Sequence, residues 1–169
     1  MKNKMTEKLF ELAYTDSMTE VQNRNAYEER LKKLRKPNAN ISRITVIVVD
    51  VNGLKEINDN YGHFCGDDAI KTVAKALRDT IGIKADIYRI GGDEFLVLIP
   101  GITENLFQSM IRSMLVDMAK SSVHLALGSV WVDDCTGKVE KSLSEADARM
   151  YEDKRAYYAK NRQLDRRRH

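Results

Sequence analysis

The sequence predicts an α+β fold in which helices flank a mixed, mainly antiparallel central sheet. Residues 44–51 (ITVIVVDV) are apolar and β-branched almost throughout, which is typical of a buried central strand. Residues 86–99 hold two more apolar segments, and paired glycines between them indicate a hairpin. Segments with helical spacing alternate with these strands, so helices must pack on the sheet. A hairpin inside such an alternation predicts a mixed sheet rather than an all-parallel one.

The first helix is predicted over residues 3–14, near the start of the chain. Its apolar side chains fall on one face, and they are Met5, Leu9 and either Leu12 or Ala13. An amphipathic helix that precedes any core element is typical of a connector, so we expect residues 1–14 to lead in from an upstream domain. Residues 15–162 then form the main domain, and residues 163–169 form a basic tail.

Helical turns are predicted on both sides of the first strand. Asn25 is expected to cap a helix that runs to Lys36, because Pro37 cannot continue it. Residues 54–60, after the strand, are expected to form one or two helical turns.

A longer helix is predicted to begin at Asp67 and to end near Thr80, because Gly62 and Gly66 interrupt the segment before it. One stripe of this helix is apolar, and it comprises Ile70, Val73, Ala74, Leu77 and Ile81.

The last third of the chain continues the alternation. Thr103 is expected to open a helix whose methionine-rich stripe we assign to core packing rather than to a partner-binding groove. Residues 122–132 are predicted to form a strand, in which Gly128 marks a bulge or a close approach of backbone. A final helix is predicted over residues 143–160.

Composition limits the class of protein. The chain has 169 residues, of which 43% are hydrophobic and 31% charged, as expected for one globular domain. No apolar run is long enough to cross a bilayer, and the net charge of +3, much of it in the basic tail, does not indicate a nucleic-acid surface. Cys65 and Cys135 show no metal-like spacing, so we interpret them as free thiols and expect a cytoplasmic protein.

Carboxylates are concentrated at two strand ends. Asp50 ends the 44–51 strand, and Asp93 and Glu94 follow Gly91 and Gly92 in the hairpin turn, whose glycines are expected to need positive φ angles. If the two strands are neighbours, these acids emerge at one edge of the sheet.

Such acids need a cation or protonation, because carboxylates about 4 Å apart repel by roughly 4 kcal/mol at an effective dielectric constant near 20. Oxygen ligands of this kind suit Mg²⁺, and they suit Mn²⁺ equally. Phosphate is the natural further ligand, and paired glycines let it approach the backbone. In the alternative interpretation, Asp50 only caps the next segment, and Asp93 and Glu94 only keep the turn solvated.

The stretch RIGGDEF, residues 89–95, contains the Gly-Gly-Asp-Glu-Phe signature of the GGDEF family of diguanylate cyclases. Three further stretches resemble the same family in the same order, at residues 16–27, 49–70 and 145–155, so that the resemblance covers residues 14 to about 160. It implies a fold similar to nucleotide cyclase and polymerase palm domains. It also implies that the domain upstream is a sensory one.

The family resemblance implies an activity and a partner. Members condense two GTP molecules into cyclic di-GMP and release two pyrophosphates. Each of two domains holds one GTP, and each 3′-hydroxyl attacks the α-phosphorus of the other nucleotide, so we expect an antiparallel homodimer during catalysis. No nucleic acid and no membrane contact is expected for this segment.

The resemblance also implies roles for the acids and lysines. Asp50, the Val51 carbonyl and Asp93 would hold the metal, and Asp93 is the candidate for accepting the proton of the 3′-hydroxyl. Glu94 would hydrogen-bond the turn or help place the substrate. Lys55 would balance charge on the phosphates, and Lys154 would reach the β- and γ-phosphates; each is otherwise a solvated lysine on a helix.

Guanine recognition is expected from the stretch at 54–70. Asn58 and Asp67 would read the base, because a carboxylate accepts from the N1 and N2 hydrogens together. Leu54 and Ile70 would sandwich the base, and His63 would lie near the substrate. In the alternative interpretation Asp67 is a helix N-cap, His63 is structural, and the two apolar residues belong to the core.

Three positions depart from the family pattern. Asn52 replaces a second aspartate, and Tyr158 stands where described members carry a phosphate-binding arginine. Ile83, three residues before Asp86, replaces the arginine of the Arg-x-x-Asp product-inhibition motif, so we expect no feedback through that site. The Tyr158 departure supports the alternative function of a catalytically silent module that binds GTP or a partner protein.

Overall fold

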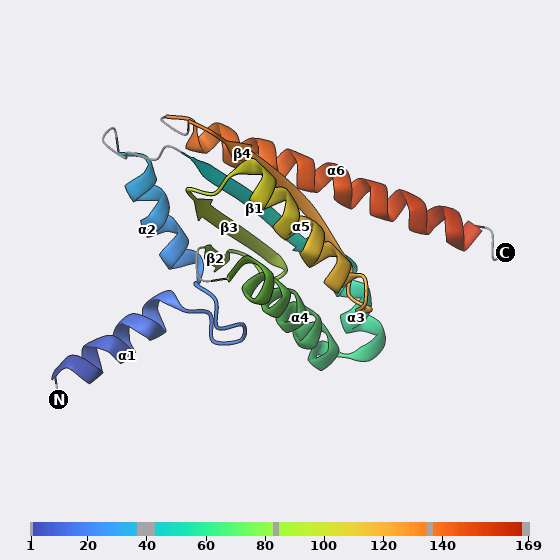
Figure 1. Ribbon diagram of the computed structural model, residues 1–169. Coiled ribbons are helices and arrows are strands. Elements are labelled where there is room, and N and C mark those ends of the chain that lie inside the picture. The colour runs from blue at the N-terminus through green and yellow to red at the C-terminus, as the bar shows by residue number, and fades with distance from the viewer. Residues whose placement is uncertain (1, 37–42, 83–84, 135–136, 167–169) are drawn as a thin grey trace.

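The computed structural model describes residues 2–36, 43–82, 85–134 and 137–166 (Figure 1). Within these ranges, four strands form one sheet in the order β2-β3-β1-β4. Their bounds are β1 Ile44–Val51, β2 Asp86–Arg89, β3 Glu94–Pro100 and β4 Leu125–Val132. Every neighbouring pair of strands is antiparallel, and the parallel component among the described residues is an isolated bridge between Gln22 and Tyr88. The sheet is therefore mainly antiparallel, as expected.

Six helices complete the described part of the domain. Their bounds are α1 Lys2–Tyr14, α2 Arg24–Leu34, α3 Leu54–Tyr61, α4 His63–Ile81, α5 Glu104–Met118 and α6 Val139–Arg166. Helices α4 and α5 cover one face of the sheet, and α2 and α6 cover the other (Figure 1). This confirms the predicted α+β arrangement.

Every residue of the central strand β1 is buried, which explains why its sequence is almost entirely apolar. Ile47, Val49 and Val51 pack in the core with α4 and α5. Val46 and Val48, which alternate with them, pack in the second core with α2 and α6. A strand covered on both faces needs apolar side chains at successive positions.

The predicted starts of α2 and α4 are wrong. The N-cap of α2 is Asn23, whose side chain accepts a hydrogen bond from Ala26 N at 3.1 Å, whereas the Asn25 side chain donates to Ala13 O. Helix α4 begins at His63 rather than at Asp67, because Gly62, at φ 85°, ends α3 and precedes α4 directly. Asp67 is therefore not a helix N-cap.

Gly66 does not interrupt the helix either. It lies buried inside α4, and a Cβ atom there would come within 2.0 Å of Asn58 Oδ1. The absence of a side chain at Gly66 lets α3 approach α4 closely. This contact holds the Asn58 side chain against the start of α4.

Gly128 confirms a close backbone approach and not a bulge, since β4 pairs with β1 residue by residue through it. A Cβ atom at Gly128 would lie 1.9 Å from the Ala146 carbonyl oxygen and 2.2 Å from Met150 N. The glycine thus lets α6 lie directly on β4. Strand β4 begins at Leu125, later than predicted, and α6 begins at Val139, earlier than predicted.

The apolar side chains of α5 are buried in the core, whereas those of α1 are exposed. In α5, Met114 and Met118 are buried with Phe107 and Ile111, so the methionine stripe belongs to the core. In α1, Leu9 and Leu12 are 60% and 69% exposed.

None of the described helices combines the length and apolarity required to span a membrane. The described thiol, Cys65, is free and exposed, whereas Cys135 lies outside the described residues.

Candidate functional site

The end of β1 lies beside the turn that contains the signature. Asp50 is paired with Glu94 across the antiparallel β1–β3 ladder. The Val51 N–H donates to the Asp93 carbonyl oxygen at 3.0 Å. The acids predicted to share an edge of the sheet therefore do so, because β3 runs back along β1 from the turn.

Asp50 is the buried member of this group of acids. Its side chain is 4% exposed, and its Oδ2 atom accepts a hydrogen bond from Lys154 Nζ at 2.7 Å. Its Oδ1 atom is buried and has no hydrogen-bond partner in the described part of the chain. Burial raises the pKa of Asp50, and the charge of Asp93 raises it further, although Lys154 opposes both.

The neighbouring charges respond to the same crowding. Burial raises the pKa of Glu94, and the charges of Asp50, Asp93 and Asp147 add to that effect. Burial lowers the pKa of Lys154, but the hydrogen bond and charge of Asp50 outweigh burial and raise it overall. The edge therefore carries an excess of negative charge that one lysine offsets only in part.

This donor set fits a divalent cation that also takes ligands from a substrate. Within the described ranges, no three His, Cys, Asp or Glu side chains are grouped as a metal site. Two carboxylates, Asp50 and Asp93, are available, and the unpartnered Oδ1 of Asp50 is a buried oxygen that lacks a positive partner. Hard cations such as Mg²⁺ are commonly held by one or two carboxylates plus phosphate and water.

The glycines of the turn differ from expectation. Neither Gly91 nor Gly92 has a positive φ angle, so a left-handed backbone is not their reason. A Cβ atom at Gly91 would lie 2.9 Å from Glu94 Oε2, whereas one at Gly92 would meet nothing within 4 Å. A side chain at Gly91 would crowd the Glu94 side chain, and the open space at Gly92 is compatible with a phosphate close to the backbone.

Arg89 fixes this turn, a role that the sequence analysis missed. Its Nη2 atom donates to the Gly92 carbonyl oxygen at 2.7 Å, and its Nη1 atom donates to Asp16 Oδ1 at 3.2 Å. Burial raises the pKa of Asp16, but hydrogen bonds from Thr19 and the charge of Arg89 lower it overall. An arginine next to the signature, with an aspartate in the turn-like segment at 16–25, was the signal that could have indicated this link.

The residues expected to read guanine lie on α3 and α4, which pack against each other. Asn58 Oδ1 is buried and unpartnered within the described residues. Asp67 is half-buried one turn after His63, which is exposed at the start of α4. Helix α3 thus brings one amide with unused hydrogen-bonding capacity against Gly66 of α4, the residue before Asp67.

Three other predicted residues have contrasting environments. Ile70 is 4% exposed in the core between the sheet and α4, and Leu54 packs against that core, as their structural alternative requires. Lys55 is exposed on α3 and forms no ion pair with any described residue, so its ammonium group is available to a ligand. Lys154, in contrast, is already engaged by Asp50.

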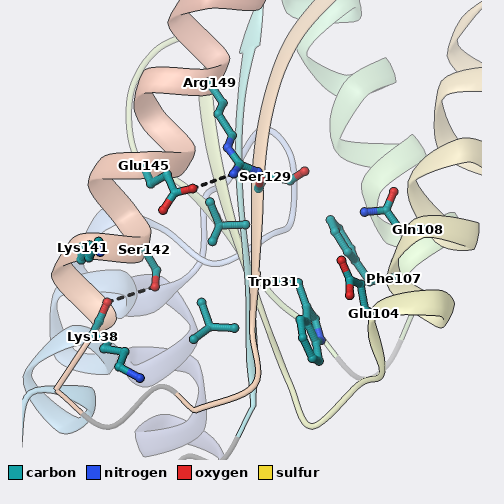
Figure 2. Close-up of a pocket in the computed structure, with 12 residues that line it drawn as sticks. Glu104, Phe107, Gln108, Ser129, Trp131, Lys138, Lys141, Ser142, Glu145 and Arg149 are labelled. Atoms are coloured by element: carbon teal, nitrogen blue, oxygen red, sulfur yellow. Dashed lines mark hydrogen bonds and ion pairs between the residues drawn. The ribbon is translucent and has the colours of Figure 1, made fainter.

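A separate pocket lies along the outer edge of β4, between α5 and α6 (Figure 2). Its volume is about 320 Å³, and Ser129 and Trp131 line it. In this pocket Arg149 Nη1 donates to the Ser129 carbonyl oxygen at 2.7 Å. Because Ser129 and Trp131 pair with Ile47 and Thr45, this pocket lies nearer the beginning of β1 than the Asp50 end. None of the predicted site residues lines it.

A profile of the family described as "Diguanylate cyclase, GGDEF domain" matches residues 13–160. The chain belongs to the GGDEF domain family. Its signature, Gly91 to Phe95, is the turn that lies beside Asp50.

Named relatives agree with this assignment of the GGDEF domain. Probable diguanylate cyclase DgcI of Escherichia coli is 31% identical over 87% of this chain and 32% of its own length. Diguanylate cyclase DgcS of Shewanella oneidensis is 30% identical over 88% of this chain and 50% of its own length. The chain therefore spans a third to a half of these curated relatives.

Solved structures share the fold of this GGDEF domain. The coiled coil and GGDEF domain of DgcB from Caulobacter crescentus, in complex with c-di-GMP, superposes with a TM-score of 0.81 at 21% identity, covering 91% of this chain and 87% of that one. The GGDEF domain of TpbB from Pseudomonas aeruginosa gives a TM-score of 0.70 at 28% identity, covering 85% and 90%.

Proposed function

We propose that this GGDEF domain is an active diguanylate cyclase, which condenses two GTP molecules into cyclic di-GMP and two pyrophosphates across a two-fold homodimer. The observation that carries this proposal is the edge where Asp50, with an unpartnered buried oxygen, is paired with Glu94 beside Asp93. The large majority of buried polar side-chain atoms are hydrogen-bonded, so an unpartnered buried carboxylate oxygen supports a bound cation at this edge.

The metal-binding residues in this proposal are Asp50, Asp93 and the Val51 carbonyl. Bound Mg²⁺ or Mn²⁺ would supply positive charge to the phosphate oxygens as negative charge develops on them. In this proposal Asp93 accepts the proton of the 3′-hydroxyl, and Lys55 balances the phosphate charge. Arg89 holds the turn that carries Asp93 through its hydrogen bonds to Gly92 and Asp16.

Base selection is assigned to α3 and α4. Asp67 accepts from the N1 and N2 hydrogens of guanine, and Asn58 contributes its unused amide oxygen. Adenine has no such pair of donors on that edge, so GTP is preferred to ATP. His63 and Leu54 are assigned to the edge of the same site.

Product feedback through an Arg-x-x-Asp site is not part of the proposal. Asp86 is paired with Arg30 of α2 at 3.1 Å. Ile83, which stands at the arginine position of that motif, lies outside the described residues. We also propose that the domain functions in the cytoplasm downstream of a sensory domain that α1 connects to it.

The competing function is a silent GGDEF module that binds GTP without turning it over. Two observations favour the silent module. Tyr158 stands where family members carry a phosphate-binding arginine, and Lys154 is hydrogen-bonded to Asp50. Incubation of the purified chain with GTP and Mg²⁺, followed by chromatographic detection of cyclic di-GMP, separates the two functions. The chain is also tested with a leucine-zipper dimer fused before α1, so that weak dimerisation is not mistaken for silence. Product that disappears in Asp93→Ala supports the cyclase, whereas bound GTP without product in the fused dimer supports the silent module.

A further inference from the structure

Strand β4 is an edge strand, because β1 pairs with it on one side and no described strand pairs with it on the other. In an antiparallel pair, successive residues point their backbone N–H and C=O groups alternately toward the neighbouring strand and away from it. The Leu127 N–H points away from β1, since it donates to Oδ2 of Asp153 on α6 at 2.9 Å. Ser129 and Trp131 follow at alternate positions, so their backbone groups also face outward.

Helix α6 covers only part of this outward edge. Asp153 accepts from Leu127 N, and Arg149 Nη1 donates to the Ser129 carbonyl oxygen at 2.7 Å. The Ser129 N–H and both backbone groups of Trp131 have no hydrogen-bond partner among the described residues. Both residues line the pocket of about 320 Å³ between α5 and α6 (Figure 2). An open edge of this kind is a template on which an extended peptide adds as a further strand.

The helices beside the edge carry one unpaired charge each, of opposite sign. Lys141 of α6 and Glu104 of α5 both line the pocket, are exposed and form no ion pair within the described ranges. The other charged side chains of the lining are paired, Arg149 with Glu145 and Lys138 with Asp134.

These two charges predict the side chains of a bound segment. Helices α5 and α6 cover opposite faces of the sheet. Side chains of an added strand alternate between the same two faces. A segment in which an acidic residue is followed directly by a basic one would therefore direct the acid toward Lys141 and the base toward Glu104.

We propose that the open end of β4 binds an extended segment of a partner protein by strand addition, and that this segment carries an acidic residue followed by a basic one. The backbone of the segment donates to Trp131 O and accepts from the N–H groups of Trp131 and Ser129. A second copy of this chain fits less well, because its own α5 and α6 would enter the space that these helices border. The proposal is independent of the cyclase reaction, since none of the acids at the Asp50 end lines this pocket.

Fluorescence titration of the full chain tests this proposal, because Trp131 is its only tryptophan. The probe is the peptide acetyl-Thr-Val-Glu-Lys-Val-Thr-amide, which contains no aromatic residue, and a saturable change in fluorescence is expected. Two further forms of the probe are N-methylated, one at its odd-numbered residues and the other at its even-numbered residues. Only alternate amides of an added strand face β4, so one form should lose binding and the other should keep it. An equal effect of both forms, or no binding of the unmethylated probe, overturns the proposal.

Ser129→Pro tests the backbone of the edge. It removes an outward N–H that takes no part in the pairing with β1, and proline is tolerated at such edge positions. We expect it to weaken the probe roughly two- to tenfold, the effect of one lost hydrogen bond, with circular dichroism confirming the fold. Unchanged affinity in folded Ser129→Pro overturns the proposal. Self-association of the wild-type chain that Ser129→Pro abolishes, measured by sedimentation, would make a second copy the occupant and would also overturn it.

Lys141→Glu tests the charge assignment without altering the backbone. It should weaken the probe about threefold or more, and a probe with lysine in place of its glutamate should regain the affinity. Lys160→Glu is the matched control, because Lys160 is exposed on the same helix and lies outside the pocket lining. An equal loss in the control, or no recovery with the exchanged probe, overturns the proposed partner chemistry.

Discussion

The Lys154 ammonium group lies 2.7 Å from Oδ2 of Asp50, and this contact joins the last helix to the end of the central strand. Asp50 is almost completely buried, while the Lys154 side chain is 31% exposed. In the free protein the lysine partly neutralises a carboxylate that is crowded by other acids. A metal bound at Asp50 would compete with this lysine for the same carboxylate.

Replacement of Lys154 should expose that competition. Lys154→Met leaves a buried carboxylate without its partner, so we expect the free energy of unfolding to fall by about 1–3 kcal/mol without metal. Added Mg²⁺ should restore more stability to this variant than to the wild type. Urea unfolding with and without Mg²⁺ measures both, and Lys160→Met, at an exposed position of α6, is the control. Equal stability of Lys154→Met and wild type would mean that the contact contributes nothing.

The Asp16–Arg89 contact predicts a pH dependence. The pKa of Asp16 is lowered in the folded state, so its contribution is present above the unfolded pKa, about 3.9, and is lost as the pH falls through the lower folded value. Asp16→Asn should therefore have a lower free energy of unfolding than the wild type at pH 7. This difference should shrink as the pH falls below the unfolded pKa of Asp16. Urea unfolding across this range measures the difference, with Asp117→Asn, an exposed aspartate in α5, as the control. A loss of stability in Asp16→Asn that does not change with pH would show that the Asp16 charge does not stabilise the fold.

Gly128 tests the seating of α6. Gly128→Ala puts a Cβ atom against the backbone of Ala146 and Met150, so we expect a loss of about 1–3 kcal/mol of stability or more, because backbone cannot move aside cheaply. Gly92→Ala is the matched control, since its Cβ atom meets nothing within 4 Å and Gly92 has no positive φ. Thermal unfolding of the two variants should differ clearly. Similar melting temperatures would show that α6 is not held against β4 as described.

Asp67 tests base selection independently of stability. Asp67→Ser removes the carboxylate that accepts two guanine hydrogens, so the ratio of kcat/KM for GTP to that for ATP should fall about tenfold or more. Steady-state kinetics with each nucleotide give this ratio. Asp68→Ser, the exposed neighbour in α4, is the control. An unchanged ratio in Asp67→Ser would remove guanine selection from this residue.

Much of the fold was predictable because strand β1 and the glycine-interrupted hairpin have unmistakable patterns, and antiparallel pairing then brings Asp50 to Glu94. The helix starts were less predictable, because Asn23 and Asn25 are both good caps and only tertiary contacts choose between them. Gly66 was misread for the same reason, since its close approach to Asn58 exists only in three dimensions.

The candidate site could also be predicted only in part from the sequence. The acids were found from local sequence, but Arg89 to Asp16 and Tyr158 to Gly53 join segments far apart in the chain. No periodicity indicates such contacts. The structure is needed to see that Tyr158, a departure from the family pattern, has a hydrogen bond of its own.

The most direct test of the central claim is a crystal structure of the chain with the α,β-methylene analogue of GTP and Mn²⁺, in which anomalous scattering locates the metal. We predict one anomalous peak, at a metal that both Asp50 and Asp93 coordinate together with phosphate oxygens of the analogue. A metal bound only by phosphates and water, or a nucleotide seated away from the Asp50–Glu94 edge, would contradict it.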